Sequence, residues 1–319
     1  MRKAALFFNP LSGRRRQKRV ADIEAALAIL REGGLEVYGK PTLGPAAAGE
    51  QAREAIARGC DAIFACGGDG TVNDVLQGLV GTDAVLGVIP LGTANALAHD
   101  LRLPFSTAAA ARAALTGQPR RIAVGRVDYR NFDGGSGSRY FTVAAGVGVD
   151  AHLFYKLNML IKGRLGMAAY YFQAMRLWLT HRMQNFAVEI GENRYDDVSQ
   201  LLAVRIRNFG GILRELAPGA DLARNDLRLV FCRTTSRVAY LRYVFRGWVG
   251  SQKQVKGIEL CDAKAVLCKP ISAVVQPRIY VEADGELLGT LPADVSVVAD
   301  ALTLLVPKQV PANVPAKTS

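Results

Sequence analysis

Short apolar runs alternate with segments of helical spacing through roughly the first third of the chain. The runs stand at 4–8, 35–38, 62–65 and 85–89. Between them, apolar residues recur every three or four positions, which is the pattern of one helix face; the first such set is Val20, Ile23, Leu27 and Leu30. This alternation predicts an α/β domain with an open, mostly parallel sheet.

Beyond about residue 120 the spacing of the apolar residues changes, and strand-like runs dominate. They stand at 122–127, 140–149, 186–190, 201–206, 227–231, 263–267, 279–283, 295–299 and 302–306. Helical spacing interrupts them near 153–181 and 236–249. We therefore expect an α/β domain at 1–121 and a mainly antiparallel β domain at 122–300. The last strand and the tail, 301–319, can return to the first domain.

The charge balance narrows the class of partner. Lys and Arg total 40 against 28 Asp and Glu, so the formal net charge is +12. Such an excess favours an anionic partner, which can be a nucleotide, a nucleic acid or an acidic membrane surface. No nucleic-acid-binding motif occurs, so we do not expect a nucleic acid.

The sequence does not support several other classes of protein. Five scattered cysteines without a CxxC pair, and only three histidines, argue against a disulfide framework and a thiolate zinc site. The apolar run after Lys3 is too short for a secretory signal. No uncharged apolar run approaches the length of about 18 residues that a transmembrane helix needs. We expect a cytoplasmic protein with no transmembrane segment.

The most informative segment is Cys66-Gly-Gly-Asp-Gly-Thr-Val-Asn73, which joins a predicted strand to a predicted helix. Backbone N–H groups converge at such a junction, and the helix dipole favours an anion there. The glycines let a phosphate approach the backbone, Thr71 can cap the helix, and Asp69 can orient water or a cation. A tight turn without a ligand would use the same residues. Neither a Walker A loop nor a dinucleotide fingerprint is present.

Two further loops follow predicted strands. Pro90-Leu-Gly-Thr-Ala-Asn95 follows the fourth strand, and Asn9-Pro-Leu-Ser-Gly13 follows the first. Neighbouring loops of this kind share the crevice at the carboxyl edge of an open sheet, where ligands bind. Basic residues crowd positions 14–19, where they suit either a triphosphate or a solvated helix face.

In this order and spacing, the three loops resemble the diacylglycerol kinase catalytic-domain family, which includes soluble bacterial lipid kinases and the sphingosine kinases. Asp284-Gly-Glu286 matches a further family motif, so the resemblance covers nearly the whole chain. NAD kinases are more distant and share the Gly67–Thr71 element. The resemblance implies an N-terminal ATP-binding domain, a C-terminal β-sandwich-like domain and an active site between them.

The resemblance also implies roles for individual residues. Nucleotide contacts are expected from Asn9, Pro10, Ser12, Gly13, Arg14, Thr42, Gly67, Gly68, Asp69, Gly70, Thr71, Val72, Asn73, Gly92, Thr93 and Asn95. Asp284 and Glu286 would serve the acceptor hydroxyl. Some bacterial members hold magnesium on a loop that matches 223–228 here. Its ligands would be the Asp226 carboxylate and the carbonyls of Ala223 and Arg228; a plain turn before the next strand is the alternative.

The segment Asp284-Gly-Glu286, the acidic motif, also indicates a function without the resemblance. Asp-Gly between alternating apolar runs predicts a hairpin turn. Glu282, Asp284 and Glu286 alternate, so they project to one face, and clustered carboxylates are costly unless they hold a cation or a proton. Phosphoryl transfer needs a carboxylate to accept the hydroxyl proton, and magnesium to neutralise the phosphates. We expect Asp284 as the base, with Glu286 as its partner or competitor; a plain hairpin is the alternative.

Two acid-free segments, 151–188 and 233–256, combine basic and aromatic residues. One helical face of the second carries Val238, Leu241, Phe245 and Trp248. Basic, aromatic-bearing amphipathic helices suit an anionic membrane interface, although such a stripe can also pack against a core.

Together these features predict an ATP-dependent lipid kinase that uses Mg²⁺ and acts at the inner face of the membrane. It would transfer the γ-phosphate to a hydroxyl of a diacylglycerol-like or other long-chain lipid. The alternatives are an NAD kinase-type phosphotransferase and a nonenzymatic module that binds nucleotide and lipid. The acceptor, the nucleotide preference and the oligomeric state stay open, with a homodimer as one option.

Overall fold

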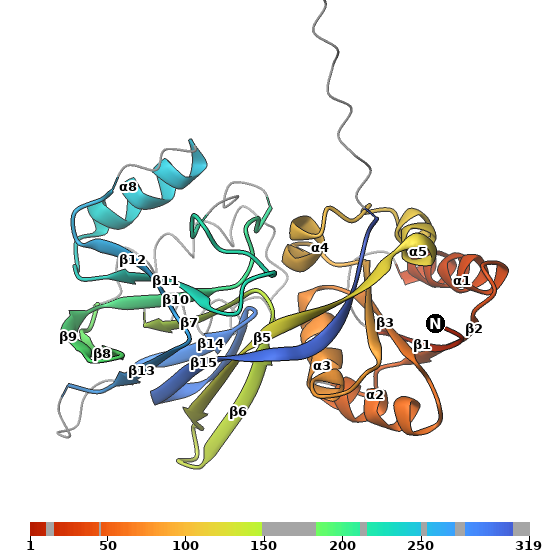
Figure 1. The fold of residues 1–319 in the computed structure, drawn as a ribbon, viewed down its shortest axis with the longest axis horizontal. Coiled ribbons are helices and arrows are strands. Elements are labelled where there is room, and N and C mark those ends of the chain that lie inside the picture. Colours follow the sequence, from red (N-terminus) through yellow and green to blue (C-terminus); the bar gives the residue numbers. More distant parts are fainter. Residues whose placement is uncertain are drawn as a thin grey trace, which may run out of the picture.

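The computed structural model describes residues 1–10, 16–44, 46–148, 183–210, 216–249, 254–271 and 278–308. Figure 1 shows two lobes side by side, an α/β lobe from the N-terminal part of the chain and a β-rich lobe from most of the rest. Two long strands run from one lobe to the other: β5 (Gln118–Arg130) and β15 (Glu286–Val306). The predicted helix at 153–181 lies outside the described residues.

Parallel strands form the sheet of the α/β lobe in the order β4-β3-β1-β2: β1 (Lys3–Phe8), β2 (Glu36–Pro41), β3 (Ala62–Gly67) and β4 (Val85–Pro90). The helices of this lobe are α1 (Arg16–Glu32), α2 (Ala47–Ala57), α3 (Asp69–Leu79), α4 (Ala96–Asp100) and α5 (Thr107–Thr116). Side chains of α2 and α3 belong to one core cluster, and those of α1 and α5 to another. Because helices cover both faces, β3 and β4 are buried along their whole length. The predicted parallel α/β domain is confirmed.

Antiparallel pairs build the β-rich lobe. Its strands are β6 (Ser136–Phe141), β7 (Ala144–Gly148), β8 (Phe186–Ile190), β9 (Asn193–Val198), β10 (Gln200–Val204), β11 (Leu227–Cys232), β12 (Ile258–Ala263), β13 (Ala265–Lys269) and β14 (Tyr280–Ala283). Its described helix is α8 (Arg237–Trp248), which lies at the outer end of the lobe (Figure 1). Alternating inward side chains of the strands form their own core cluster. The predicted antiparallel, sandwich-like domain is confirmed.

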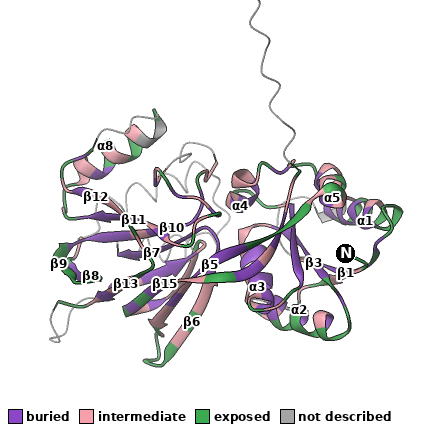
Figure 2. Cartoon of the chain, viewed as in Figure 1, coloured by how far each residue is buried: buried purple, intermediate pink, exposed green. Residues whose placement is uncertain are grey.

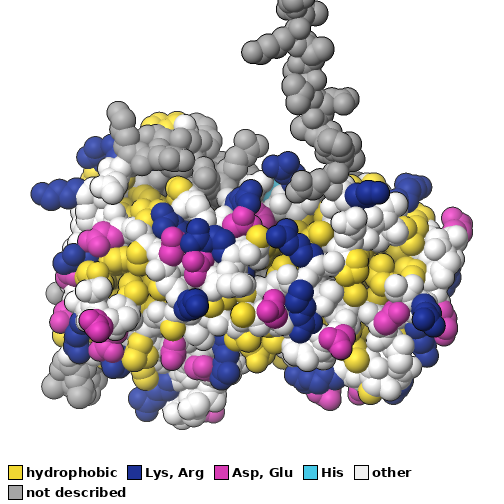
Figure 3. Space-filling model, viewed as in Figure 1, with side chains coloured by type: hydrophobic (Ala, Val, Ile, Leu, Met, Phe, Trp, Pro, Cys, Tyr) yellow, Lys and Arg dark blue, Asp and Glu magenta, His cyan; other side chains and the backbone are white. Residues whose placement is uncertain are grey.

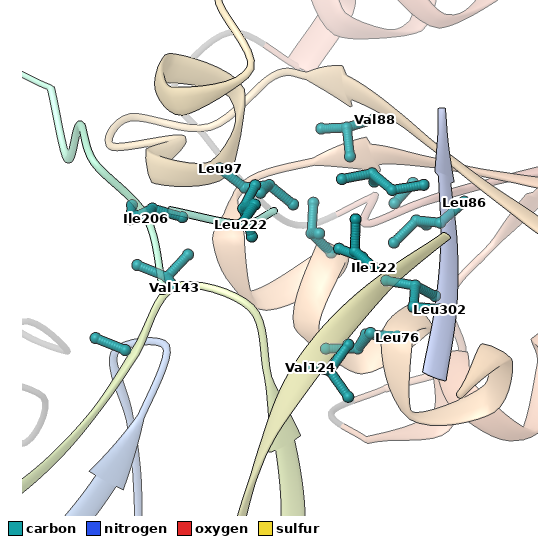
Figure 4. Close-up of a cluster of buried hydrophobic side chains, with 14 of the residues drawn as sticks. Leu76, Leu86, Val88, Leu97, Ile122, Val124, Val143, Ile206, Leu222 and Leu302 are labelled. Carbon is teal, nitrogen blue, oxygen red and sulfur yellow. The ribbon is translucent and has the colours of Figure 1, made fainter. Parts of the chain in front are cut away.

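The last strand links the two sheets. β15 pairs antiparallel with β5 over most of its length, and near its end Thr303 lies opposite Val85 of β4 in a parallel pairing. The hydrophobic core also continues from one lobe into the other. Figure 4 shows Leu86, Ile122 and Leu302 of the α/β side close to Val124 and Leu76, while Val143, Ile206 and Leu222 extend the same cluster toward the β-rich lobe. Figure 2 shows the central strands of both lobes buried, the outer strands β6 and β9 mostly intermediate or exposed, and the described part of α8 mostly intermediate or exposed.

The structure divides one predicted strand. The run 140–149 was expected to be continuous, but β6 and β7 are separated at 142–143. The N–H groups of this break donate to the carboxylate of Asp284, at 3.0, 2.9 and 3.0 Å from Thr142, Val143 and Ala144. The strand stops because a side-chain acceptor, 140 residues away from Ala144 in sequence, takes the place of a sheet partner. Periodicity alone cannot reveal such an acceptor.

Candidate active site

The predicted phosphate loops meet at one edge of the parallel sheet. Asn9 and Pro10 follow β1, and Thr42 follows β2, where its N–H donates to the Phe8 carbonyl at 2.9 Å. The glycine loop follows β3, and Gly92 follows β4. Because the strands are parallel, their carboxyl ends lie together, as the sequence predicts. Ser12, Gly13 and Arg14 lie outside the described residues.

The glycine loop leads directly into a helix N-terminus. α3 begins at Asp69, with Gly68 as its N-cap and no side chain capping it. Thr71, expected as the cap, is buried within the first turn together with Val72 and Asn73. The first N–H groups of a helix lack partners within the helix, so Gly68, Asp69 and Gly70 present donors and a partial positive charge to an anion. This is the geometry that a phosphate needs.

The second loop touches the first. A Cβ placed on Gly92 would lie 2.3 Å from the Cα of Gly68, so neither backbone could keep its place if position 92 carried a side chain. Asn95 holds the loop from inside: its backbone is left-handed, its Oδ1 accepts from Gly92 N at 3.1 Å, and its Nδ2 donates to the Gly92 carbonyl at 2.8 Å. Thr93 remains exposed. The two loops therefore form one surface, with Asn95 shaping it.

Asp69 ties this surface to the next helix. Its Oδ1 accepts a hydrogen bond from the N–H of Ala96, the first residue of α4, at 2.7 Å. Burial raises the pKa of Asp69, and the backbone hydrogen bonds from Ala96 and Asn95 oppose that rise. Asp69 thus fixes the two loops relative to each other and places a carboxylate beside the glycine loop.

The acidic motif forms a hairpin turn that reaches the glycine-loop helix. Asp284 and Gly285 have φ of 48° and 80°, the left-handed values of a two-residue turn between β14 and β15. Burial raises the pKa of Asp284, while its hydrogen bonds act in the opposite direction. The Asp284 N–H donates to the Ala144 carbonyl at 2.9 Å, so the turn is fixed at its backbone as well as its side chain.

Both oxygens of Asp284 accept hydrogen bonds from N–H groups. Oδ1 accepts from the backbone of Val143 and Ala144, at 2.9 and 3.0 Å. Oδ2 accepts from Thr142 N at 3.0 Å and from the Asn73 side-chain amide, on α3, at 2.9 Å. The hydroxyl of Thr142 makes a longer contact with the same oxygen, at 3.5 Å. This one carboxylate therefore joins the turn, the strand break and the glycine-loop helix.

Arg139 of β6 connects the second carboxylate to the same helix. Its guanidinium donates to Asn73 Oδ1 at 2.8 Å, to Asp74 Oδ1 at 2.6 Å and to Glu286 Oε2 at 2.8 Å. Burial raises the pKa of Glu286, and the charge of Arg139 opposes that rise. A Cβ on Gly70 would lie 3.4 Å from Glu286 Oε1, so Glu286 reaches the glycine loop. The sequence analysis missed Arg139, which stands in the polar segment just before the predicted strand at 140–149.

The expected metal loop is occupied by internal ion pairs. The two oxygens of Asp226 accept from Arg224 at 2.6 and 2.7 Å. The Asp226 carbonyl accepts from Arg205, and the Arg228 guanidinium donates to Asp262 at 3.0 Å. Ala223 lies beside them in the loop, and among the described residues no group of three or more His, Cys, Asp or Glu is placed to hold a metal ion. These residues do not fit a metal ion in this arrangement, because the carboxylate that would bind it is already neutralised.

Each lobe matches the model of a known protein domain family. Residues 3–127 match the model of the diacylglycerol kinase catalytic domain. Residues 142–306 match that of the YegS C-terminal NAD kinase beta sandwich-like domain. A protein named diacylglycerol kinase from Bacillus subtilis is 27% identical over 97% of this chain and 98% of its own length. One from Mycobacterium tuberculosis is 29% identical over 96% of each chain.

Solved structures agree at the level of the fold. A crystal structure described as a diacylglycerol kinase from Bacillus anthracis superposes with a TM-score of 0.69, at 18% identity, over 95% of this chain and 96% of its own. Yeast NADH kinase with bound NADH is a more distant match, with a TM-score of 0.51 and 11% identity over 96% of this chain and 84% of its own. No helix in the described ranges has the length and hydropathy to cross a bilayer. The matched models span both lobes, so the chain belongs to the diacylglycerol kinase catalytic-domain family and is a lipid kinase, a phosphotransferase.

Proposed function

We propose that this enzyme transfers the γ-phosphate of magnesium-bound ATP to the hydroxyl of a diacylglycerol-like or other long-chain lipid, in the cytoplasm and at an anionic membrane surface. One observation carries the proposal most directly. The turn with the acidic motif contacts the helix that begins at the glycine loop, through the 2.9 Å hydrogen bond between Asn73 and Asp284. Carboxylates from one lobe therefore reach the phosphate surface of the other.

The nucleotide would lie along the carboxyl edge of the parallel sheet. The N–H groups of Gly68, Asp69 and Gly70 at the start of α3, and that of Thr93, would face the phosphates and stabilise negative charge without a change in position during the reaction. Asn9, Pro10 and Thr42, from the ends of β1 and β2, would line the remainder of the nucleotide site together with Ser12, Gly13 and Arg14. Magnesium arrives with ATP as part of the substrate and neutralises phosphate charge.

The acceptor hydroxyl needs a base, and Asp284 is the residue we assign to it, with Glu286 beside it. A base must lie within hydrogen-bond reach of the proton that it takes. Burial raises the pKa of both carboxyl groups, which strengthens them as proton acceptors.

The outer helix α8 supports the membrane part of the proposal. Three of its apolar side chains are largely exposed: Val238, Leu241 and Phe245 are 65%, 49% and 57% exposed. The sequence allowed this stripe to be core, and for these residues the structure places it outside. Arg237, Arg242 and Arg246 alternate with it along the helix. Figure 3 shows basic and hydrophobic side chains together at this end of the molecule. An anionic bilayer would bury the apolar stripe and attract the arginines.

The direct test is phosphorylation of a lipid panel. Purified protein would be incubated with magnesium–ATP and mixed micelles that contain diacylglycerol, other long-chain lipid alcohols or no acceptor, and the products identified by mass spectrometry. We expect a phosphorylated lipid. Turnover of NAD with none of the lipids would favour the NAD kinase-type alternative. Binding of ATP and vesicles without any product would favour the nonenzymatic module.

A further inference from the structure

Arg205 carries a charge into the interior of the protein. It follows β10, and its exposed fraction is 1%. It is the largest fully buried side chain among the described residues. Removing a guanidinium from water is expensive unless its donors are satisfied. Burial lowers the pKa of Arg205 to about 10, so the group stays charged at neutral pH.

Backbone carbonyls, rather than carboxylates, surround this charge. Nη1 donates to the carbonyls of Arg224, at 2.8 Å, and Asp226. Nη2 donates to the carbonyls of Ala123, at 2.9 Å, and Leu222, at 3.2 Å. Three of these carbonyls belong to the loop that precedes β11, and the fourth belongs to β5. Nε is buried and has no hydrogen-bond partner within the described residues.

Converging carbonyl oxygens are the ligands of a hard cation such as Mg²⁺ or Ca²⁺. Here they spread along two nitrogens of a planar guanidinium, a shape that a single ion does not match. The nearby Asp226 carboxylate turns to Arg224 in a two-bond ion pair. A divalent ion at this place would meet an internal positive charge and a carboxylate that is already paired.

We propose that the guanidinium of Arg205 occupies the cation position of the 222–228 loop in place of a metal ion. The loop is then closed permanently by a side chain of the same chain, and its structure does not depend on a divalent metal.

The segments around Arg205 pack against α4, the helix that follows the second loop. Leu222 of the loop belongs to the same core cluster as Leu97 of α4, and Figure 4 shows the two side chains close together beside Ile206. Asp100, at the end of α4, accepts from the N–H groups of Arg207 and Asn208 at 2.8 and 3.0 Å. α4 follows the loop of Gly92 and Thr93 directly, so the Arg205 site supports a phosphate loop from behind.

The first test needs no substitution and no substrate. Nucleotide-free, full-length protein would be unfolded by heat in chelator, in Mg²⁺ and in Ca²⁺, and titrated with Mn²⁺ under electron paramagnetic resonance. We expect the same melting temperature in all three buffers and no stoichiometric Mn²⁺ site. A one-to-one Mn²⁺ site that is lost in Asp226→Asn, or a lower melting temperature in chelator, would overturn the proposal.

The second test asks whether the charge itself is required. Arg205→Met leaves four buried carbonyls without donors, so its melting temperature should fall by about 5–10 °C. Arg233→Met is the matched control, because Arg233 is 36% exposed and pairs with Asp197 and Glu259 at the surface; it should change little. Arg205→Ala should regain stability in millimolar methylguanidinium but not in equal NaCl. An unchanged Arg205→Met, or equal effects of the two salts, would contradict the proposal, and failure of the variants to fold would leave the metal titration to decide it.

Discussion

Two arginines at the junction of the lobes are held in different ways. Arg139 is partly exposed, at 13% of its side chain, and pairs with the carboxylates of Asp74 and Glu286. Arg205 pairs with backbone carbonyls and is sealed from solvent. A carboxylate carries a charge and can take up a proton, whereas a backbone carbonyl is neutral and does not titrate in this pH range. The comparison suggests that Arg139 sets the electrostatics of the active site, and that Arg205 holds the fold around it.

The largest expected effect concerns Asp284, whose carboxylate joins the strand break at 142–143 to α3, the helix that follows the glycine loop. Asp284→Asn should lower kcat by roughly 10²-fold or more, because it removes the proposed base. The structure adds a second consequence. Every oxygen of Asp284 accepts N–H donors, so an amide nitrogen in its place would face donors and lower the melting temperature too.

Steady-state kinetics, ATP affinity and thermal unfolding of Asp284→Asn would be measured beside Glu286→Gln. Unchanged ATP affinity with lost turnover would agree with the assignment. An active Asp284→Asn with an inactive Glu286→Gln would move the base assignment to Glu286.

The next effect separates the two arginines. Arg139→Met should lower kcat/KM by roughly 10- to 100-fold, because Glu286 and Asn73 lose the group that orients them. Its melting temperature should change less than that of Arg205→Met. The two variants would be compared by lipid phosphorylation and by thermal unfolding. If both lost stability equally and activity only in proportion to unfolded protein, the distinction between them would be wrong.

A smaller effect should appear in the pH profile. A carboxyl group acts as a base only when ionised, so activity should rise with pH as the proton leaves. Burial raises the pKa of Asp284 and Glu286, which places the acid limb above the ordinary carboxyl range near pH 4. Arg139 lowers the pKa of Glu286, so Arg139→Met should move to higher pH any acid limb that Glu286 sets, and leave in place the limb that Asp284 sets. Arg126→Met, at an exposed ion pair, should leave the profile unchanged.

The smallest effect concerns α8, which is remote from both arginines. Leu241→Ser should weaken binding to anionic vesicles by roughly 5- to 10-fold, because less apolar area enters the interface. Vesicle sedimentation at several anionic lipid fractions would measure it. Phe132→Ser, an exposed apolar residue outside α8, is the control. Equal binding of all three proteins would exclude α8 as the docking surface.

The sequence was informative where function depends on local backbone. The loops after β1, β3 and β4 could be placed at one edge because strand–helix alternation predicts a parallel sheet, and the structure agrees. Asp-Gly at 284–285 predicted the hairpin that is seen. The sequence could not predict contacts between residues that are far apart along the chain. Nothing local to Arg139 indicates Asp74 and Glu286, which are 65 and 147 residues away.

Arg205 shows the same limit more sharply. It lies within the run predicted as a strand at 201–206, one residue beyond the end of β10, and its partners are carbonyls that no residue type reveals. The metal loop was expected from resemblance, and only the structure shows that Asp226 is paired with Arg224 and that the carbonyls converge on a guanidinium.

A competition assay tests the central claim most directly. One reaction would hold the enzyme, γ-labelled magnesium–ATP, diacylglycerol in mixed micelles and NAD at equal concentration, with Asp284→Asn as the parallel control. The account predicts label in the lipid fraction, little or none in NADP, and loss of lipid labelling in the variant. Label that accumulates in NADP, or lipid labelling that persists in Asp284→Asn, would contradict the account of how the two lobes form a lipid kinase.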